Sequence, residues 1–525
     1  MREGFFGLNI AVRGLYTAQR SMDIVNHNLN NVNTPGYSRQ QGVQTASNPM
    51  ALFDGTGMIG TGSEIRTVNR VRDEYLDFKY WSENDTYGEW DVKRTLLSDV
   101  EATFNEPSKS GFATIMNDFY NSLQELAKDP SSPATRSIVQ QRGLTLTKYF
   151  NSTATHFEKL QEDANDCVKS QVENINALGV QIQQLNRQIY VSELDGNTAN
   201  DLRDQRTLLV DKLSKLINID ANEVVAGKLP SGQDDKRFVI TISGKAFVDH
   251  FDISKLALIP RTTPLNQGDA PNMYDVGWED GNSLTIKSGE LRGYLDVRDG
   301  NDGIAGSGGT KTPAYKGIPY YMRKLDSFVQ TFAKAFNEGI IDGTDGIGHA
   351  DGTGLNGSTG IDFFTMLGTD GRAMSTSEFN SLSANVDTRY SHLTAKNFTV
   401  SYDVATDSNK IATADPAGQS GNILTLNELL KARGNTHMFA EGAPEDYMKS
   451  LVSTLGIDSQ QASIFSNNQN AIVNQLTNRR ASVSGVSIDE EMANLIKYQQ
   501  AYNASAHMIT TMAEVYDTLI NKLGV

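Results

Sequence analysis

The sequence predicts a multidomain α + β protein with paired N- and C-terminal coiled-coil helices, a long-helix bundle domain and inserted small β domains. Three observations predict this architecture. Both chain ends carry heptad patterns, residues from about 66 to 217 are helical in pattern almost throughout, and short β-branched runs begin near residue 220. A chain of 525 residues is also long enough for several domains.

The composition excludes several kinds of protein. A net charge of -16 with no basic stripe argues against a nucleic-acid partner, and no apolar run approaches the roughly 20 residues of a membrane span. The single cysteine, Cys167, excludes an intrachain disulfide and a cysteine zinc site, and its helical context predicts a buried side chain. The N-terminus lacks the continuous apolar core of a secretory signal, so composition alone suggests a cytoplasmic protein.

The last forty residues carry a heptad seam, in which apolar residues alternate spacings of four and three with Gln499 as the one polar member. Ser487 and Glu490 form a capping-box pattern at its start. The seam consists of Ile488, Met492, Leu495, Gln499, Tyr502, Ala506, Ile509, Ala513, Tyr516, Ile520 and Leu523.

The first residues carry the same spacing, at Leu8, Ala11, Leu15, Ala18, Met22, Val25, Leu29 and Val32. A narrow seam is stable only when another helix covers it. Residues 1–47 hold four Arg against two acids, whereas residues 487–525 hold two Lys against five acids. The two ends are therefore expected to pair with each other. Two ordinary core helices are the alternative, which does not explain so regular a seam at both extremes of the chain.

A turn should end the first helix, because Pro35 and Gly36 suit the two central positions of a type II turn. Residues 41–65 are rich in Gly, Ser and Thr, which predicts a loop or short extended strands leading away from the terminal helices. Further helices are expected at about 71–104, 111–128, 134–194, 199–217, 318–341 and from 444 to the C-terminus. Strands are expected at 224–225, 238–242, 246–248, 283–286 and weakly around 398–412.

These elements suggest four domains. They are a terminal coiled coil (1–60 and 482–525), a helical bundle (61–218, about 318–341 and 443–481), a β domain (219–317), and a glycine-rich, partly β outer domain (342–442).

No constellation of catalytic or metal-binding residues emerges from the sequence. The acidic and glycine-rich tract 342–360 misses the spacing of a calcium loop, so a flexible surface loop is the better interpretation. The seven His are scattered, and His27 and His507 in the end helices suit a polar rim or pairing role. The aromatic residues Tyr80, Trp81, Tyr87 and Trp90 could stack on a ligand but are expected to anchor the bundle. The chain is therefore predicted to be no enzyme and to need no cofactor or metal.

Residues 28–39, NLNNVNTPGYSR, closely resemble the N-terminal signature of the bacterial flagellar axial proteins of rod, hook and hook-filament junction. The matching motif positions are Asn28, Asn31, Asn33, Thr34, Pro35, Gly36 and Tyr37. Residues 490–502, EEMANLIKYQQAY, resemble the matching C-terminal signature. Three internal stretches, at 199–206, 289–299 and 318–337, are similar to the hook-filament junction members of the family rather than to hook or rod proteins.

The resemblance implies a secreted structural protein at the hook-filament junction, exported unfolded through the flagellar type III pathway without a cleaved signal. It also implies that the two seams form the assembly interface. The implied partners are hook protein, a second junction protein, neighbouring copies and an export chaperone. The free monomer is expected to keep both ends largely disordered, because an unpaired seam cannot offset its ordering entropy.

Other readings remain open at this point. Another axial component, such as a hook or rod protein, would carry the same end motifs. A surface adhesin or sugar-binding protein would use the β domains and the aromatic cluster, and a hydrolase lacks any group of candidate residues.

Overall fold

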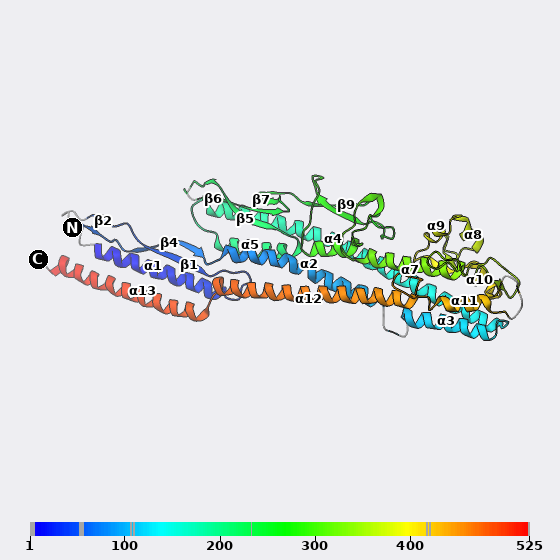
Figure 1. Cartoon of the computed structure of the whole chain (residues 1–525). Helices are drawn as coiled ribbons and strands as arrows, with labels where there is room; N and C mark the ends of the chain where they lie inside the picture. The colour runs from blue at the N-terminus through cyan, green and yellow to red at the C-terminus, as the bar shows by residue number, and fades with distance from the viewer. Residues whose placement is uncertain are drawn as a thin grey trace.

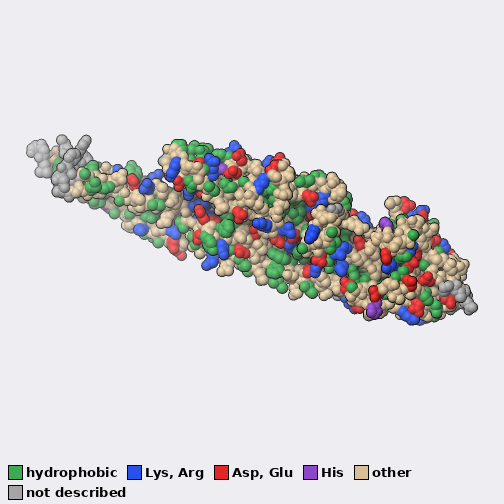
Figure 2. Space-filling model, turned by 45° about the horizontal axis from the view of Figure 1, so that its top comes forward, with side chains coloured by type: hydrophobic (Ala, Val, Ile, Leu, Met, Phe, Trp, Pro, Cys, Tyr) green, Lys and Arg blue, Asp and Glu red, His purple; other side chains and the backbone are tan. Residues whose placement is uncertain are grey.

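The computed structural model describes residues 6–51, 57–104, 108, 111–230, 232, 234–415, 418 and 422–522. The molecule is elongated, with the first and last helices side by side at one narrow end and small helices and strands at the other (Figure 1). Acidic and basic side chains are interspersed over the broad part, without a large patch of one sign on the face in Figure 2. In the described residues, no helix is long and apolar enough to cross a membrane.

The narrow end contains the expected pair of terminal helices. Helix α1 (Phe6–Asn30) packs against α13 (Ile488–Asp517), which continues into a short π-helical segment (Thr518–Lys522). Ser487 Oγ accepts a hydrogen bond from the Glu490 N–H at 3.5 Å, but the Glu490 carboxylate pairs with Arg39 rather than completing a capping box. The predicted pairing of the chain ends is confirmed.

Residues 41–51 and 57–65 contain short strands, as one of the two expectations had it, but these strands lie back along α1, so the prediction that they lead away from the terminal helices is wrong. Strand β1 (Gln40–Ala46) pairs antiparallel with β4 (Ser63–Arg70), and β2 (Met50–Ala51) pairs with β3 (Met58–Ile59). Thr17 Oγ1 of α1 donates to the Ser63 carbonyl at 2.8 Å. The close approach depends on Gly62, whose φ of +113° suits glycine and where a Cβ would lie 3.2 Å from the Arg13 side chain.

Long helices run along the length of the molecule, as the sequence predicts (Figure 1). They are α2 (Glu74–Phe104), α3 (Phe112–Lys128), α4 (Pro133–Glu193), α5 (Asn200–Leu216), α7 (Ile318–Glu338) and α12 (Pro444–Ser484). Their shared core is rich in fully buried aromatic rings, among them Phe104, Phe150, Phe328 and Phe332. The aromatic residues of α2 anchor the bundle, since Trp81 Nε1 donates to Asp211 of α5 at 2.7 Å and the ring centroids of Trp90 and Phe465 of α12 are 4.7 Å apart.

The β region is a four-stranded antiparallel sheet, in the order β5 (Asp220–Lys228), β6 (Asp234–Ile242), β7 (Lys245–Asp249) and β8 (Asp252–Ile253). Strands β9 (Leu256–Pro260) and β10 (Tyr274–Trp278) form a separate pair. The sheet packs on α4, where a Cβ on Gly179 would lie 2.5 Å from Phe247. Cys167 of the same helix is half-buried, rather than fully buried as predicted.

The predicted strand at 283–286 is absent, and a helix follows it, α6 (Glu290–Asp299). The backbone carbonyls of the segment bond to side chains instead of to a strand: the Thr285 carbonyl accepts from Ser243 Oγ, and the Ile286 carbonyl accepts from Arg292 at 3.3 Å. Its β-branched residues thus lie in the connection between β10 and α6. Sequence pattern alone does not distinguish a β-strand from an irregular connection of the same composition.

The far end is built from short elements. They are α8 (Thr376–Ser381), α9 (Val386–Tyr390), α10 (Tyr402–Thr406), α11 (Leu424–Ala432), the pair β11 (Thr353–Gly354) and β14 (Ala412–Ala414), the pair β12 (Phe364–Met366) and β13 (Phe398–Val400), and the 3-10 turns Ser307–Gly309 and Ser408–Lys410. The glycine-rich tract is not a flexible surface loop at its centre. His349 is fully buried there, its Nδ1 donates to the Ile361 carbonyl at 2.6 Å, and its Nε2 accepts from Ala412 N–H at 2.9 Å.

Candidate assembly site at the paired chain ends

Small residues let α1 and α13 approach closely. A Cβ added to Gly7 would lie 3.1 Å from Met512 Cε, and one added to Gly14 would lie 3.1 Å from Ser505 Oγ. Farther along, Asn28 Nδ2 donates to Glu491 Oε2 at 3.2 Å. The residue number on α13 falls by the same amount as the residue number on α1 rises from one contact to the next. The two helices are therefore antiparallel and keep one register along their length.

The seam between the helices combines predicted and unpredicted positions. Among the predicted residues, Ala11, Ala18 and Val25 are buried on α1, and Leu495, Tyr502, Ile509 and Tyr516 are half-buried on α13. Between them, contacts join Gly7 to Met512, Gly14 to Ser505 and Asn28 to Glu491. Ser21, which is buried, and Tyr498, which is half-buried, occupy the remaining position of the same register. The sequence analysis missed these eight because the α1 positions hold Gly, Ser and Asn, and the apolar spacing that it followed runs one residue later on each helix.

The remaining predicted residues lie one position later on each helix, which turns them about 100° away from the seam. They are Leu8, Leu15, Met22 and Leu29 on α1, Met492, Gln499, Ala506 and Ala513 on α13, and Ile520 in the π-helical segment that follows α13. Ile488, the first residue of α13, keeps the seam register seven residues before Leu495 but is 53% exposed. Val32 lies half-buried in the turn after α1, and Leu523 lies outside the described residues.

Because the helices are antiparallel, both displaced sets fall on the same side of the pair. We call this side the open face and define it by Leu8, Leu15, Met22, Leu29, Met492 and Ile520. Met492 of α13 is 46% exposed and Ile520 of the π-helical segment is 63% exposed, whereas the four α1 members are half-buried. The opposite side of α1 is covered by the hairpin, where Ile24 Cδ1 would lie 3.0 Å from a Cβ on Gly42. The pair thus has one covered side and one apolar side with nothing over it among the described residues.

The motif that follows α1 forms a joint between the terminal pair and the helical region. Asn28 is buried and uses its whole amide group. Its Nδ2 donates to the Gln40 carbonyl at 2.9 Å and to Glu491, while its Oδ1 accepts from Gln40 N–H at 2.9 Å and from Tyr37 Oη at 2.7 Å. Burial, followed by the nearby carboxylates of Asp201, Asp204 and Glu491, raises the pKa of Tyr37, so its hydroxyl stays a donor.

The turn after α1 has the predicted geometry. Gly36 has a φ of +79°, Tyr37 N–H donates to the Thr34 carbonyl at 3.2 Å, and a Cβ on Gly36 would lie 3.2 Å from Leu208 of α5. Thr34 Oγ1 donates to Asn31 Oδ1 at 3.1 Å, and Asn31 Nδ2 donates back to the His27 carbonyl at 3.0 Å. Asn33, Thr34 and Pro35 are themselves exposed.

Helix α5 holds this turn through two carboxylates. Asp204 is buried and accepts Ser38 N–H at 2.7 Å, Ser38 Oγ at 2.8 Å and Arg70 at 3.0 Å. Asp201 accepts Gln40 Nε2 at 2.6 Å and lies 3.3 Å from His27 Nε2. The stretch 199–206, which resembles junction proteins, is therefore the part of α5 that faces the terminal motif.

A chain of charge pairs continues from this turn into the helical region. Arg72 contacts Ser38 and makes two hydrogen bonds to Asp77 of α2, at 2.5 and 2.9 Å. Arg480 of α12 bridges Asp77 at 2.8 Å and Asp211 of α5 at 2.9 Å. On the other side of the turn, Arg39 Nε pairs with the buried Glu491 at 2.8 Å. Sequence reasoning missed these pairs, because charged partners far apart in a chain leave no periodic signal.

The site holds hydrogen-bond and packing groups rather than reactive ones. In the part of the chain that the structure describes, no group of three or more His, Cys, Asp or Glu side chains is placed to hold a metal ion. The arrangement can fix the terminal pair to the helical region and expose the open face to a partner.

Comparison with protein families matches three parts of the chain. The model described as flagellar hook-associated protein FlgK helical domain matches residues 97–364. The flagellar basal body rod FlgEFG protein C-terminal model matches residues 479–523, and the flagella basal body rod protein model matches residues 8–37. The last two cover α13 and α1 with its motif.

Full-length relatives agree with these matches. The chain is 29% identical to flagellar hook-associated protein 1 of Bacillus subtilis (strain 168), over 100% of this chain and 99% of the relative. It is 25% identical to flagellar hook-associated protein 1 of Escherichia coli (strain K12), over 98% and 99% of the two chains. The solved structure of the flagellar hook junction protein FlgK from Burkholderia pseudomallei shares the fold with a TM-score of 0.57 at 14% identity, over 78% of this chain and 100% of that chain.

Proposed function

We propose, from the premise that this chain belongs to the FlgK family of flagellar hook-associated proteins, that its terminal helix pair is the element through which it assembles. The chain is a structural protein of the bacterial flagellum, at the hook-filament junction, and not an enzyme. The single observation that carries the finer proposal is the open face. An apolar side of a helix pair that nothing in the described chain covers needs a partner in water.

The partners follow from this position in the flagellum. We infer that the open face packs on neighbouring copies of the chain, and that hook protein and a second junction protein contact the same terminal pair from its two ends. Such contacts are heterologous, because a ring or helix of identical subunits joins different surfaces of successive copies. The domain limits inferred from the sequence fit this arrangement, with 1–60 and 482–525 innermost, the helical bundle around them, and 219–317 and 342–442 facing outward.

The proposal also includes the route by which the chain leaves the cell. The chain is expected to pass the flagellar type III channel unfolded, with an export chaperone covering the C-terminal helix until assembly. The sparse burial of α13 supports this, since Glu491 is its one buried residue among those described and most of the helix therefore gains little from folding in the monomer.

The test is to incubate purified, tagged protein with isolated hooks and to locate the tag by electron microscopy. Label confined to the distal tip is the expected result. Met492→Asp places a charge on the open face and should abolish tip label, whereas Gln500→Asp, an exposed position half a helical turn round from the seam residue Tyr498, should retain it. Long self-polymers would indicate a hook-like component, and equal tip label for both variants would contradict the role of the open face.

A further inference from the structure

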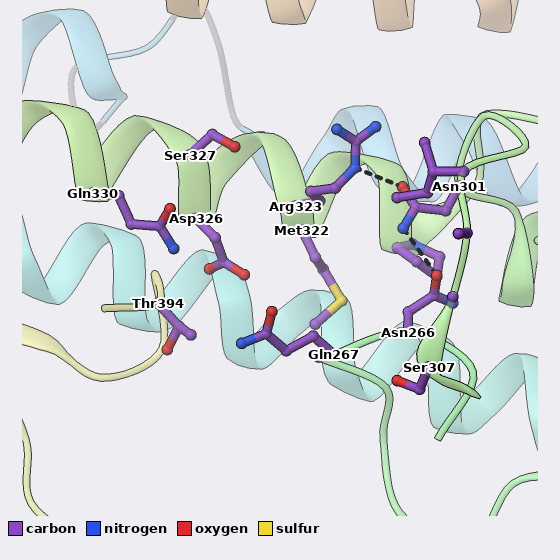
Figure 3. Close-up of a pocket in the computed structure, with 15 residues that line it drawn as sticks. Asn266, Gln267, Asn301, Ser307, Met322, Arg323, Asp326, Ser327, Gln330 and Thr394 are labelled. Carbon is purple, nitrogen blue, oxygen red and sulfur yellow. Dashed lines mark hydrogen bonds between the residues drawn. The ribbon is translucent and has the colours of Figure 1, made fainter. Parts of the chain in front are cut away.

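A partly enclosed cavity with polar and apolar walls lies far from the terminal pair, where three regions of the chain meet. Its volume is about 330 Å³. One wall is α7, the second is formed by the loop around Asn266 between β9 and β10 and the loop around Ile304 after α6, and the third is the segment at Thr394 of the far end (Figure 3). The cavity is large enough for a chain of several non-hydrogen atoms and too polar to stay dry.

Asp326 supplies the only negative charge that lines this cavity. Its Oδ1 accepts the Ala395 N–H at 2.7 Å, and its carboxylate points from α7 into the space between Gln267 and Thr394 (Figure 3). Burial raises the pKa of Asp326 to about 6, the Ala395 N–H offsets this in part, and no neighbouring cation contributes. Asp77, Asp204 and Asp299 are buried, and each is paired with arginine. Asp326 is half-buried, and its carboxylate has no basic partner among the described residues.

The other charged side chain of the lining, Arg323, is not that counter-charge. It lies one turn earlier on α7, and its Nε donates to Asn301 Oδ1 at 2.8 Å on the other side of the helix from the Asp326 carboxylate (Figure 3). No other titratable side chain lines the cavity from the loops or from the far-end segment.

The groups around Asp326 suit a donor-rich cation on an alkyl stem. Gln330 Nε2 donates to the Leu393 carbonyl at 2.8 Å, which leaves its Oε1 as an acceptor beside the carboxylate. The hydroxyl groups of Ser327 and Thr394 also line the space. Met322 forms an apolar wall, with its Cε 3.3 Å from where a Cβ on Gly268 would lie.

We propose that this cavity binds a primary ammonium group on a short alkyl chain, with Asp326 as its counter-charge. An ammonium has three N–H donors, which Asp326, Gln330 and the two hydroxyl groups can accept, while its methylene groups contact Met322. The group comes either from a free alkylamine or from a lysine side chain of a second copy. The proposal does not depend on the role of the terminal helices.

The first measurement is calorimetric titration of the intact chain with n-butylammonium, with n-butanol as the neutral probe of equal length. Saturable one-to-one binding of the ammonium and none of the alcohol is expected. Asp326→Asn keeps an acceptor for Ala395 N–H and should weaken binding at least tenfold. Asp370→Asn, which alters an exposed carboxylate, should leave it unchanged. Binding should be about tenfold tighter at pH 7.5 than at pH 5, because the carboxylate must be ionised.

The second measurement separates the two sources of the ammonium. A zero-length carbodiimide couples a carboxylate to an adjacent amine, so an Asp326–lysine link between copies assembled on hooks would identify a lysine. Binding of butylammonium without such a link would identify a free amine. The proposal is overturned if neither binding nor link is found, or if Asp326→Asn, with the melting temperature of the parent chain, binds butylammonium equally well.

Discussion

Two antiparallel helix pairs, α1 with α13 and α2 with α12, differ in what lies between them. The α2–α12 pair joins a core of large side chains, with α12 residues such as Leu451 and Leu455 buried and Trp90 packed on Phe465. The α1–α13 seam is made of glycine, alanine and serine between half-buried larger residues. Burying a leucine contributes about 1.5–3 kcal/mol, and these small side chains contribute far less.

The difference indicates that the α2–α12 pair is fully packed within one chain, whereas the α1–α13 pair is not. Small seam residues bring α1 and α13 close together, and this leaves the large apolar residues beside the seam on the open face. We therefore interpret the terminal pair as half of a larger packing unit, whose other half is supplied by neighbouring copies.

The largest expected effect comes from Leu495→Asp. A charge at this half-buried seam position has no partner on α1 and should cost the pairing roughly 3–5 kcal/mol, which abolishes incorporation at hook tips. The melting transition of the helical region that contains α2, α4 and α12, followed by circular dichroism, should be unchanged. Lys497→Asp, at an exposed position, is the matched control. Normal motility of the Leu495→Asp strain would contradict the claim that the α1–α13 seam is needed for incorporation.

A smaller effect is expected at the joint between the two pairs. Asp204→Asn leaves Arg70 and Arg72 without their shared carboxylate and should lower the free energy of unfolding by about 3 kcal/mol in a denaturant titration. Asp201→Asn, whose side chain is half-exposed, should lower it by less than 1 kcal/mol. Similar losses for the two variants would mean that the joint is not held by the buried carboxylate.

The seam itself can be tested by size. Gly14→Leu would drive a side chain into Ser505 and should weaken pairing by about 1–3 kcal/mol, seen as faster proteolysis of the chain ends in protein assembled at hook tips. Tyr16→Leu, at a strongly exposed position of the same helix, should leave the cleavage rate unchanged. If Gly14→Leu is cleaved no faster than Tyr16→Leu, the close approach of the helices is not needed.

The far end should differ from the terminal pair in its response to pH. Burial, followed by the negative charge of Glu338, raises the pKa of Asp362 to about 7, so the folded state holds a proton that the unfolded state has lost. Stability of this region should therefore fall as pH rises from about 4 to about 7, by up to about 4 kcal/mol. Asp362→Asn should remove that slope in thermal melts at pH 5 and pH 8. An unchanged slope would exclude Asp362 as its source.

The helices and the pairing of the chain ends were predicted well from the sequence. A heptad pattern indicates a helix, and its narrow apolar stripe indicates that another helix must cover it. The structure places about half of the predicted seam residues, such as Ala18 and Leu495, between α1 and α13. The others, such as Leu15 and Met492, lie one residue after the contact positions Gly14 and Glu491. A search for apolar spacing passes over contact positions that hold glycine or a polar residue.

The joint was not predictable in the same way. Asn28 contacts Glu491, and Arg480 contacts Asp77, only after the chain has run out to the far end and returned, and polar contacts of this kind have no sequence period. The strand expected at 283–286 failed for a related reason. Its residues have strand composition, but the Thr285 and Ile286 carbonyls bond to the side chains of Ser243 and Arg292.

The central claim, that the terminal pair is completed only by assembly, is tested most directly by amide hydrogen exchange. The account predicts that residues 6–30 and 488–517 of the free protein exchange quickly while α2, α4 and α12 are protected, and that the same residues become protected once the protein is bound at hook tips. Strong protection of α1 and α13 in the free monomer would contradict it.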